Sequence, residues 1–172
     1  MNDVTEPTLP SVTIVIEWEN AIDAERRWAC RAVAALAQEL APASRRMQRR
    51  PKVAYLYDPK LVDPDVIPQS CAEAAPTLRD VAEVSVTAAP GLSYYRLKNY
   101  GVAHTDTELS ILLDSDAAPE PGWLEGMIAP FADPSVMAVG GITVLAHDDL
   151  LSRTLALSWI FDTREERDKT VK

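Results

Sequence analysis

Two aspartates stand one residue apart directly after an apolar run. The triplet Asp114-Ser115-Asp116 follows segment 109–113, whose composition predicts a buried β-strand. Two carboxylates at this spacing on a turn can converge on one hard cation, and Mg²⁺ or Mn²⁺ completes its ligand shell with water and substrate phosphates. A bare Asp-x-Asp is common and more often forms a turn or a helix cap. Its place after a buried strand favours a metal site.

Further carboxylates follow two other predicted strands. Glu17 and Glu19 come after strand 12–16, and Asp58 comes after strand 53–57. Because ligands of parallel α/β sheets bind beyond the carboxyl ends of the strands, we expect these side chains to gather near the aspartate triplet. Each has a plainer alternative, since Glu17 and Glu19 could be exposed to solvent and Asp58 could be a turn residue.

Strand-like and helix-like segments alternate along the chain. The predicted strands are 12–16, 53–57, 81–87, 109–113 and 136–145. The predicted helices are 21–40, 65–75, 93–102, a helix that begins at Pro121 and ends before Asp133, and 150–161. This alternation is typical of an α/β fold in which a mostly parallel sheet carries helices on both faces.

Three residues make specific predictions about these helices. Asn20 is expected to cap the first long helix, and Pro42 is expected to end it. Gly101 lies inside the predicted helix 93–102, where glycine is about 1 kcal/mol less favourable than alanine. Its presence there predicts close packing against a neighbouring element.

The composition is that of a globular domain. The chain has 172 residues, of which 47% are hydrophobic and 25% charged, so disordered, collagen-like and coiled-coil proteins are excluded. Two cysteines and two histidines suggest neither a disulfide framework nor a histidine-rich metal site. The first ten residues do not resemble a signal peptide, and no apolar run reaches the ~18 residues of a membrane span. We therefore expect a cytoplasmic protein, either free or at the cytoplasmic face of the membrane, without a transmembrane segment.

Acidic side chains dominate the middle of the chain. The net charge is −9, and residues 61–150 hold fourteen acidic and three basic side chains. This balance argues against nucleic acid as a partner and suits a divalent cation, although solubility alone could explain it. The basic segment 45–52 could bind an anion or a membrane surface, but a solvated turn is the favoured interpretation.

Several common nucleotide and hydrolase motifs are absent from the sequence, namely the phosphate-binding P-loop, the dinucleotide Gly-x-Gly-x-x-Gly and the hydrolase Gly-x-Ser-x-Gly. Instead, the chain resembles family 2 glycosyltransferases, which have the Rossmann-like GT-A nucleotide-sugar fold. The resemblance covers about residues 10–160 and rests on the order of five segments, which are 11–16 with Asn20, 90–101, 111–116, 119–124 and 130–141.

The resemblance implies a role for each candidate residue. Asp116 would bind the divalent cation that bridges the diphosphate of a UDP- or GDP-type sugar, and Asp114 would contact the ribose or share the metal. Asp58 would face the nucleobase, Glu19 would border the nucleotide, and Lys98 would lie near the diphosphate or the sugar. A solvated Lys98 is the plainer alternative. The implied activity is transfer of the sugar to an acceptor that the sequence does not identify, by an inverting hexosyltransferase if the enzyme is complete.

Inverting members of the family use a carboxylate base from a later element, and no residue here is recognisable as that base. Glu165, Glu166 and Asp168 lie in a charged tail. We therefore expect only the N-terminal donor-binding part of the fold, truncated at its C-terminus, with an incomplete donor-binding or interaction module as the alternative function. The expected organisation is a flexible segment 1–10, a nucleotide-sugar-binding domain 11–161 and a charged tail 162–172. A second copy of the chain could cover the apolar segment 150–161 and form a homodimer.

Overall fold

The computed structural model describes residues 8–23 and 26–143. The chain divides into two compact units, residues 1–125 and 126–172. The expectations for the helix 150–161, the charged tail and the homodimer lie outside the described residues. Among the described residues, no helix combines the length and the hydrophobicity needed to cross a membrane.

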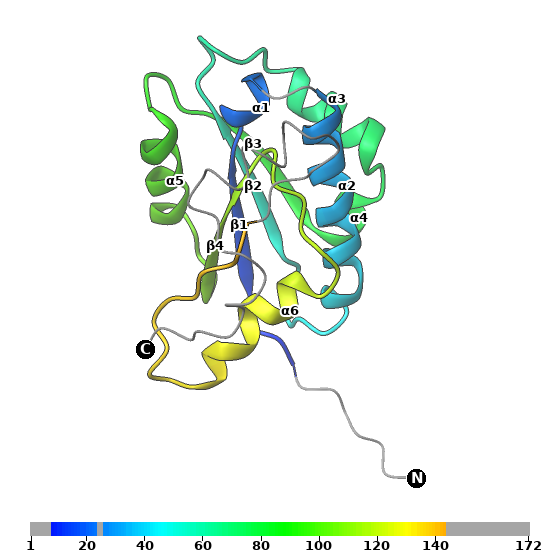
Figure 1. Cartoon of the computed structure of the whole chain (residues 1–172), viewed down its shortest axis with the longest axis vertical. Coiled ribbons are helices and arrows are strands. Elements are labelled where there is room, and N and C mark those ends of the chain that lie inside the picture. Colours follow the sequence, from blue (N-terminus) through cyan, green and yellow to red (C-terminus); the bar gives the residue numbers. More distant parts are fainter. Residues whose placement is uncertain (1–7, 24–25, 144–172) are drawn as a thin grey trace, which may run out of the picture. The chain divides into compact units, whose positions relative to one another are not determined.

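The first unit contains a four-stranded sheet (Figure 1). Its strands are β1 (Val12–Glu17), β2 (Lys52–Tyr57), β3 (Glu83–Ala88) and β4 (Leu109–Asp114). They pair in the order β3-β2-β1-β4, and every pair is parallel. The prediction of a parallel α/β sheet is confirmed.

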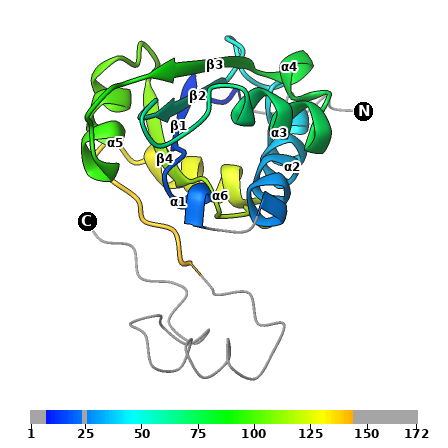
Figure 2. The ribbon, with the colours of Figure 1, turned by 90° about the horizontal axis from the view of Figure 1, so that it is seen from above.

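Helices cover both faces of this sheet (Figure 2). One face carries α2 (Arg26–Ala43), α3 (Val66–Ala74) and α4 (Leu78–Val81), and the other carries α5 (Tyr94–Ala103). The short α1 (Asn20–Asp23) follows β1, and α6 (Trp123–Ile128) runs into the 3₁₀ helix η1 (Ala129–Ala132). The Rossmann-like architecture is therefore present.

The core forms around the central strand β1, all six residues of which are buried. On the α2 face, Ile16 and Tyr55 lie next to Leu36 of α2. Trp18 is 2% exposed and meets the Tyr55 ring edge-on, with the ring centroids 5.5 Å apart. This apolar layer holds the carboxyl ends of β1 and β2 in place.

On the α5 face, the closest helix–sheet approach is at Gly101. A Cβ atom built on Gly101 would lie 2.3 Å from Cγ1 of Val15 and 2.8 Å from Cδ1 of Leu56. The expectation that this glycine allows close packing is confirmed. Leu97, one turn earlier, is fully buried in the same cluster.

Several boundaries differ from the sequence prediction. The predicted helix 21–40 is built as α1 and α2, and α2 continues through Pro42 to Ala43. Pro42 lacks the backbone N–H that would continue the hydrogen-bond pattern, and the helix ends one residue later. The predicted fifth strand is wrong over 136–143, which have no regular secondary structure. Gly140 and Gly141 weaken a strand there because they bring backbone entropy and no side-chain packing.

In the second unit, the described residues are 126–143. Here Pro130 stands at the start of η1, and Asp133 ends this short helix. The Asp133 carboxylate accepts hydrogen bonds from the amide and the hydroxyl of Ser135, at 2.9 and 2.7 Å. The predicted stop at Asp133 is confirmed.

Candidate functional site

Two carboxylates stand side by side where β1 and β4 end. Glu17 and Asp114 are register partners on these adjacent parallel strands. Both belong to the α5 face, because Val15, two residues before Glu17, packs against Gly101 of α5. The strand pairing therefore brings together two acids that are far apart in sequence.

Helix α5 supplies the groups that bind Asp114. Oδ1 of Asp114 accepts a hydrogen bond of 2.6 Å from the Tyr94 hydroxyl and forms an ion pair with Nζ of Lys98. Nζ of Lys98 also donates to the Tyr94 hydroxyl at 2.6 Å. Tyr94 and Lys98 are four residues apart, so they lie on one side of the helix and reach the same carboxylate.

This network shifts the pKa values of its members. Burial opposes the charge of Lys98, but the bonds to Asp114 and Tyr94 outweigh it and raise the pKa of Lys98 above its usual value. Burial and the adjacent Asp114 carboxylate likewise raise the pKa of Tyr94. Both groups therefore keep their protons at neutral pH and act as donors toward Asp114.

Glu17 is the most deeply buried acid of the site, with 0% of the residue exposed. Its Oε2 accepts hydrogen bonds from the backbone N–H groups of Glu19 at 2.8 Å and Asn20 at 3.4 Å. Burial raises the pKa of Glu17 to about 7, although the two backbone bonds and nearby Lys98 favour its charged form. The alternative of a solvent-exposed Glu17 is wrong.

The middle residue of the aspartate triplet has a structural role. Ser115 is 2% exposed, and its Oγ accepts a 3.0 Å hydrogen bond from the backbone N–H of Ala21. The turn after β4 is thereby tied to the first turn of α1. The start of α1 is bound by Ser115 and Glu17, whereas the sequence predicted Asn20 as its cap.

The two aspartates of the triplet differ in exposure. Asp116 is exposed, and Asp114 is partly buried beneath Lys98 and Tyr94. No group of three or more His, Cys, Asp or Glu side chains in the described part of the chain is arranged to hold a metal. Two carboxylates on one turn instead fit a cation that takes most of its ligands from water and phosphate. Asp114 can bind such a cation only if the cation shares the Asp114 carboxylate with Lys98 or if Lys98 leaves that carboxylate.

Asp58 lies at the end of β2 and is 6% exposed. Its two oxygens accept 3.0 Å hydrogen bonds from the backbone N–H groups of Lys60 and Gly91. Gly91 has a φ of +71°, a conformation that glycine adopts without strain. Asp58 therefore forms the expected turn and also connects the loops that follow β2 and β3. Glu19 lies partly exposed on the neighbouring loop.

Sequence reasoning missed Tyr94 and Ser115 as parts of this site. The spacing of Tyr94 and Lys98 was a usable signal, because residues four apart on a predicted helix share one face. The bond from Ala21 to Ser115 had no such signal, because its partners are separated by 94 positions in the sequence.

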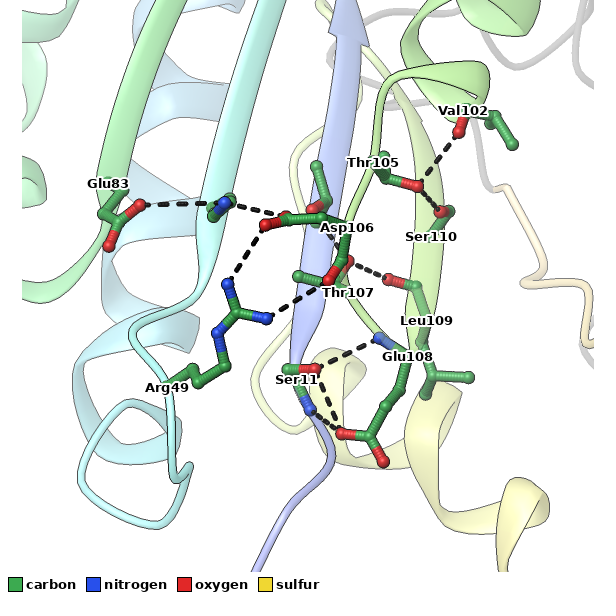
Figure 3. A network of polar contacts seen from close by, with 12 residues as sticks. Ser11, Arg49, Glu83, Val102, Thr105, Asp106, Thr107, Glu108, Leu109 and Ser110 are labelled. Carbon is green, nitrogen blue, oxygen red and sulfur yellow. Dashed lines mark hydrogen bonds and ion pairs between the residues drawn. The ribbon is translucent and has the colours of Figure 1, made fainter.

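The basic segment 45–52 lies at the other, amino-terminal end of the strands. Arg49 and Lys52 both bind the Asp106 carboxylate, at 3.1 and 2.7 Å, before β4 begins (Figure 3). Arg46 forms an ion pair with Glu125. These contacts show that the segment joins elements of the fold by ion pairs, rather than forming only a solvated turn.

A groove of about 500 Å³ does not include the aspartate triplet. It runs along β2 and β3 beside the second half of α5, and Leu56, Thr87, Tyr100 and His104 are among its lining residues. The space next to Asp114 and Ser115 is only about 10 Å³ and lies under them, against α2. This space is too small for a nucleotide, and Asp116 lies on the exposed side of the turn.

Comparison with known proteins identifies the family. A family model described as glycosyl transferase family 2 matches residues 86–171, which is half of the chain. The match includes Lys98, Asp114 and Asp116, whereas Glu17, Glu19 and Asp58 lie outside it. A search of curated proteins found no match. The chain belongs to glycosyl transferase family 2.

Proposed function

We propose that this chain binds a nucleoside-diphosphate sugar at the carboxyl ends of its strands, with a divalent cation held by Asp116 and Asp114, for transfer of the sugar to an acceptor. One observation carries the proposal. The aspartate triplet lies at the end of β4, at the edge where parallel α/β sheets bind their ligands, and within the residues that match the family.

The charges at this edge explain why a cation is needed. Glu17, Glu19, Asp58, Asp114 and Asp116 all belong to this edge, which thus holds five carboxyl groups. Lys98 is a basic side chain that is bound to one of them, Asp114. A diphosphate is itself an anion, so carboxylates repel it unless a cation lies between them. When bound, Mg²⁺ or Mn²⁺ would neutralise the charge that develops on the departing nucleoside diphosphate.

The residues of this chain would then have distinct roles. Asp116 is exposed and can bind a cation without rearrangement. Lys98 can offer its ammonium group to a phosphate oxygen, since it already lies at the edge. Asp58 connects the two loops that would surround the nucleobase, and its remaining lone pairs can accept a hydrogen bond from an N–H of uracil or guanine. Glu19 borders the nucleotide from the loop after β1.

The experiment is titration calorimetry of UDP, and of GDP in parallel, with Mn²⁺ and with EDTA. We expect the wild-type protein to bind either UDP or GDP, and to do so only in the presence of Mn²⁺. Asp116→Asn should weaken that binding at least tenfold. Asp80→Asn is the matched control, because Asp80 is exposed on α4 and makes the same change of charge. Absence of binding to either nucleotide, or unchanged binding by Asp116→Asn, contradicts the proposal. Binding of the nucleotide without sugar transfer to any acceptor favours the alternative of a non-catalytic donor-binding module.

A further inference from the structure

One oxygen of the site has no partner. Oε2 of Glu17 binds two backbone N–H groups, but Oε1 is buried and has no hydrogen-bond partner among the described residues. Buried carboxylate oxygens without a partner are rare because losing water is costly. The unpaired Oε1 of Glu17 is explained if a hydrogen-bond donor reaches this oxygen in another state of the protein, such as the cation-bound state.

Lys98 is the donor best placed to reach this oxygen. Glu17 and Asp114 are register partners on the sheet face that α5 covers, and Lys98 extends from α5 to Asp114. The Lys98 side chain is 12% exposed, so its ammonium group needs protein partners. An ammonium group has three N–H donors, and the observed acceptors are Asp114 and the Tyr94 hydroxyl.

A cation at Asp114 conflicts with this arrangement. Two positive groups that share one carboxylate repel each other, and the repulsion is strong where water is scarce. Lys98 is bound to Oδ1 of Asp114, so a cation that takes the whole carboxylate, rather than sharing it through Oδ2, displaces Lys98. The carboxyl group that is nearest in the strand register, and that has a free oxygen, is Glu17.

We propose that Glu17 is a second binding position for the Lys98 ammonium group: when a divalent cation takes the Asp114 carboxylate, Lys98 moves to Oε1 of Glu17. This inference rests on the proposed function, because it requires a cation at the aspartate triplet. Glu17 is then a positioning residue, which acts through Lys98 and does not touch the donor. The exchange keeps a positive group at the edge, where the diphosphate arrives.

The test measures cation affinity directly. Mn²⁺ is titrated calorimetrically into the wild-type protein and into Glu17→Gln, with the same UDP concentration in cell and syringe. Glutamine keeps an oxygen for the backbone bonds but loses the charge that attracts Lys98. We expect the apparent dissociation constant for Mn²⁺ to rise about tenfold, since a charged group loses its buried partner. Glu83→Gln is the control, because Glu83 is exposed at the amino end of β3.

A Lys98→Met background separates this role from a merely structural one. We expect Glu17→Gln to change Mn²⁺ affinity little when Lys98 is already absent. An equal loss in both backgrounds, or no loss in either, overturns the inference and leaves the proposed function intact. A wild-type protein that binds no Mn²⁺ in the presence of UDP overturns both.

A measurement on the wild-type protein covers the case in which Glu17→Gln does not fold. Protein labelled with ¹⁵N-lysine and ¹³C-carboxyl aspartate and glutamate is studied by NMR with Mg²⁺ and UDP. Without ligands, we expect a hydrogen-bond coupling between Nζ of Lys98 and the carboxyl carbon of Asp114. When the protein is saturated with Mg²⁺ and UDP, the coupling should instead join Nζ of Lys98 to the carboxyl carbon of Glu17. A coupling that stays with Asp114 in the saturated complex overturns the exchange.

Discussion

Single side chains hold the loops of the site by binding backbone groups. Glu17 binds the amides that open α1, Ser115 binds the next amide, and Asp58 joins the loops after β2 and β3. These bonds fix the turns from which Asp114 and Asp116 extend. The aspartate triplet is therefore positioned by its neighbours, and its central serine has a structural role.

Glu17 makes the stability of the protein depend on pH. The pKa of Glu17 is about 7 in the folded protein and 4.5 without the fold, so the folded state binds this proton more tightly. Binding of this proton adds to the free energy of unfolding. The contribution is fully present below pH 4.5 and is lost as the pH rises through 7. Its size is up to about 3 kcal/mol, from the shift in pKa.

We therefore predict that the wild-type protein loses stability relative to Glu17→Gln between pH 5 and pH 8. Urea unfolding of both proteins at several pH values gives this difference, in which the contributions of groups that do not interact with Glu17 cancel. Parallel pH profiles for the two proteins would show that Glu17 does not titrate in this range.

At the scale of elements, the position of α5 decides the geometry of the site. Tyr94 and Lys98 reach Asp114 only because the helix lies close to β1 and β2 at Gly101. An alanine there would place a methyl carbon 2.3 Å from a Val15 side-chain atom, which is far inside van der Waals contact. Val15 is buried and cannot yield freely.

Gly101→Ala is predicted to destabilise the protein by about 1–3 kcal/mol, because the overpacking outweighs the better helix propensity of alanine. The matched control is Gly126→Ala in α6, where an added Cβ meets nothing within 4 Å. That variant should be neutral or up to about 1 kcal/mol more stable. Equal effects of the two substitutions in thermal unfolding would refute the packing argument.

The elements of the sheet could be predicted from the sequence, and their contacts could not. Three apolar runs predicted β1, β2 and β4, because each is bounded by proline or charged residues, and valines alternating with small or acidic residues predicted β3. The fifth strand failed over 136–143, since the same hydrophobic pattern there is interrupted by two glycines. The gathering of acids at one edge followed from parallel strands. The burial of Glu17 and the bond from Tyr94 to Asp114 depend on how α5 crosses the sheet, which no local pattern encodes.

At the scale of the whole chain, charge is divided between the two ends of the sheet. Arg49 and Lys52 are joined to Asp106 at the amino end, so their charges are already paired. The carboxyl end holds the acids of the candidate site, and Lys98 among them is bound to Asp114. A cation added to the protein should therefore collect at the carboxyl end.

The most direct test of this account is to locate Mn²⁺ on the folded protein by NMR. Mn²⁺ is paramagnetic and broadens the signals of nearby amides, so a titration of ¹⁵N-labelled protein with Mn²⁺ and UDP maps the site. We predict that broadening begins at residues 114–117 and 18–21 and that signals near Asp106 and Lys52 persist. Broadening that begins at the amino end of the sheet, or uniform broadening over the whole surface, would contradict the assignment of the donor site to the Asp114-Ser115-Asp116 turn.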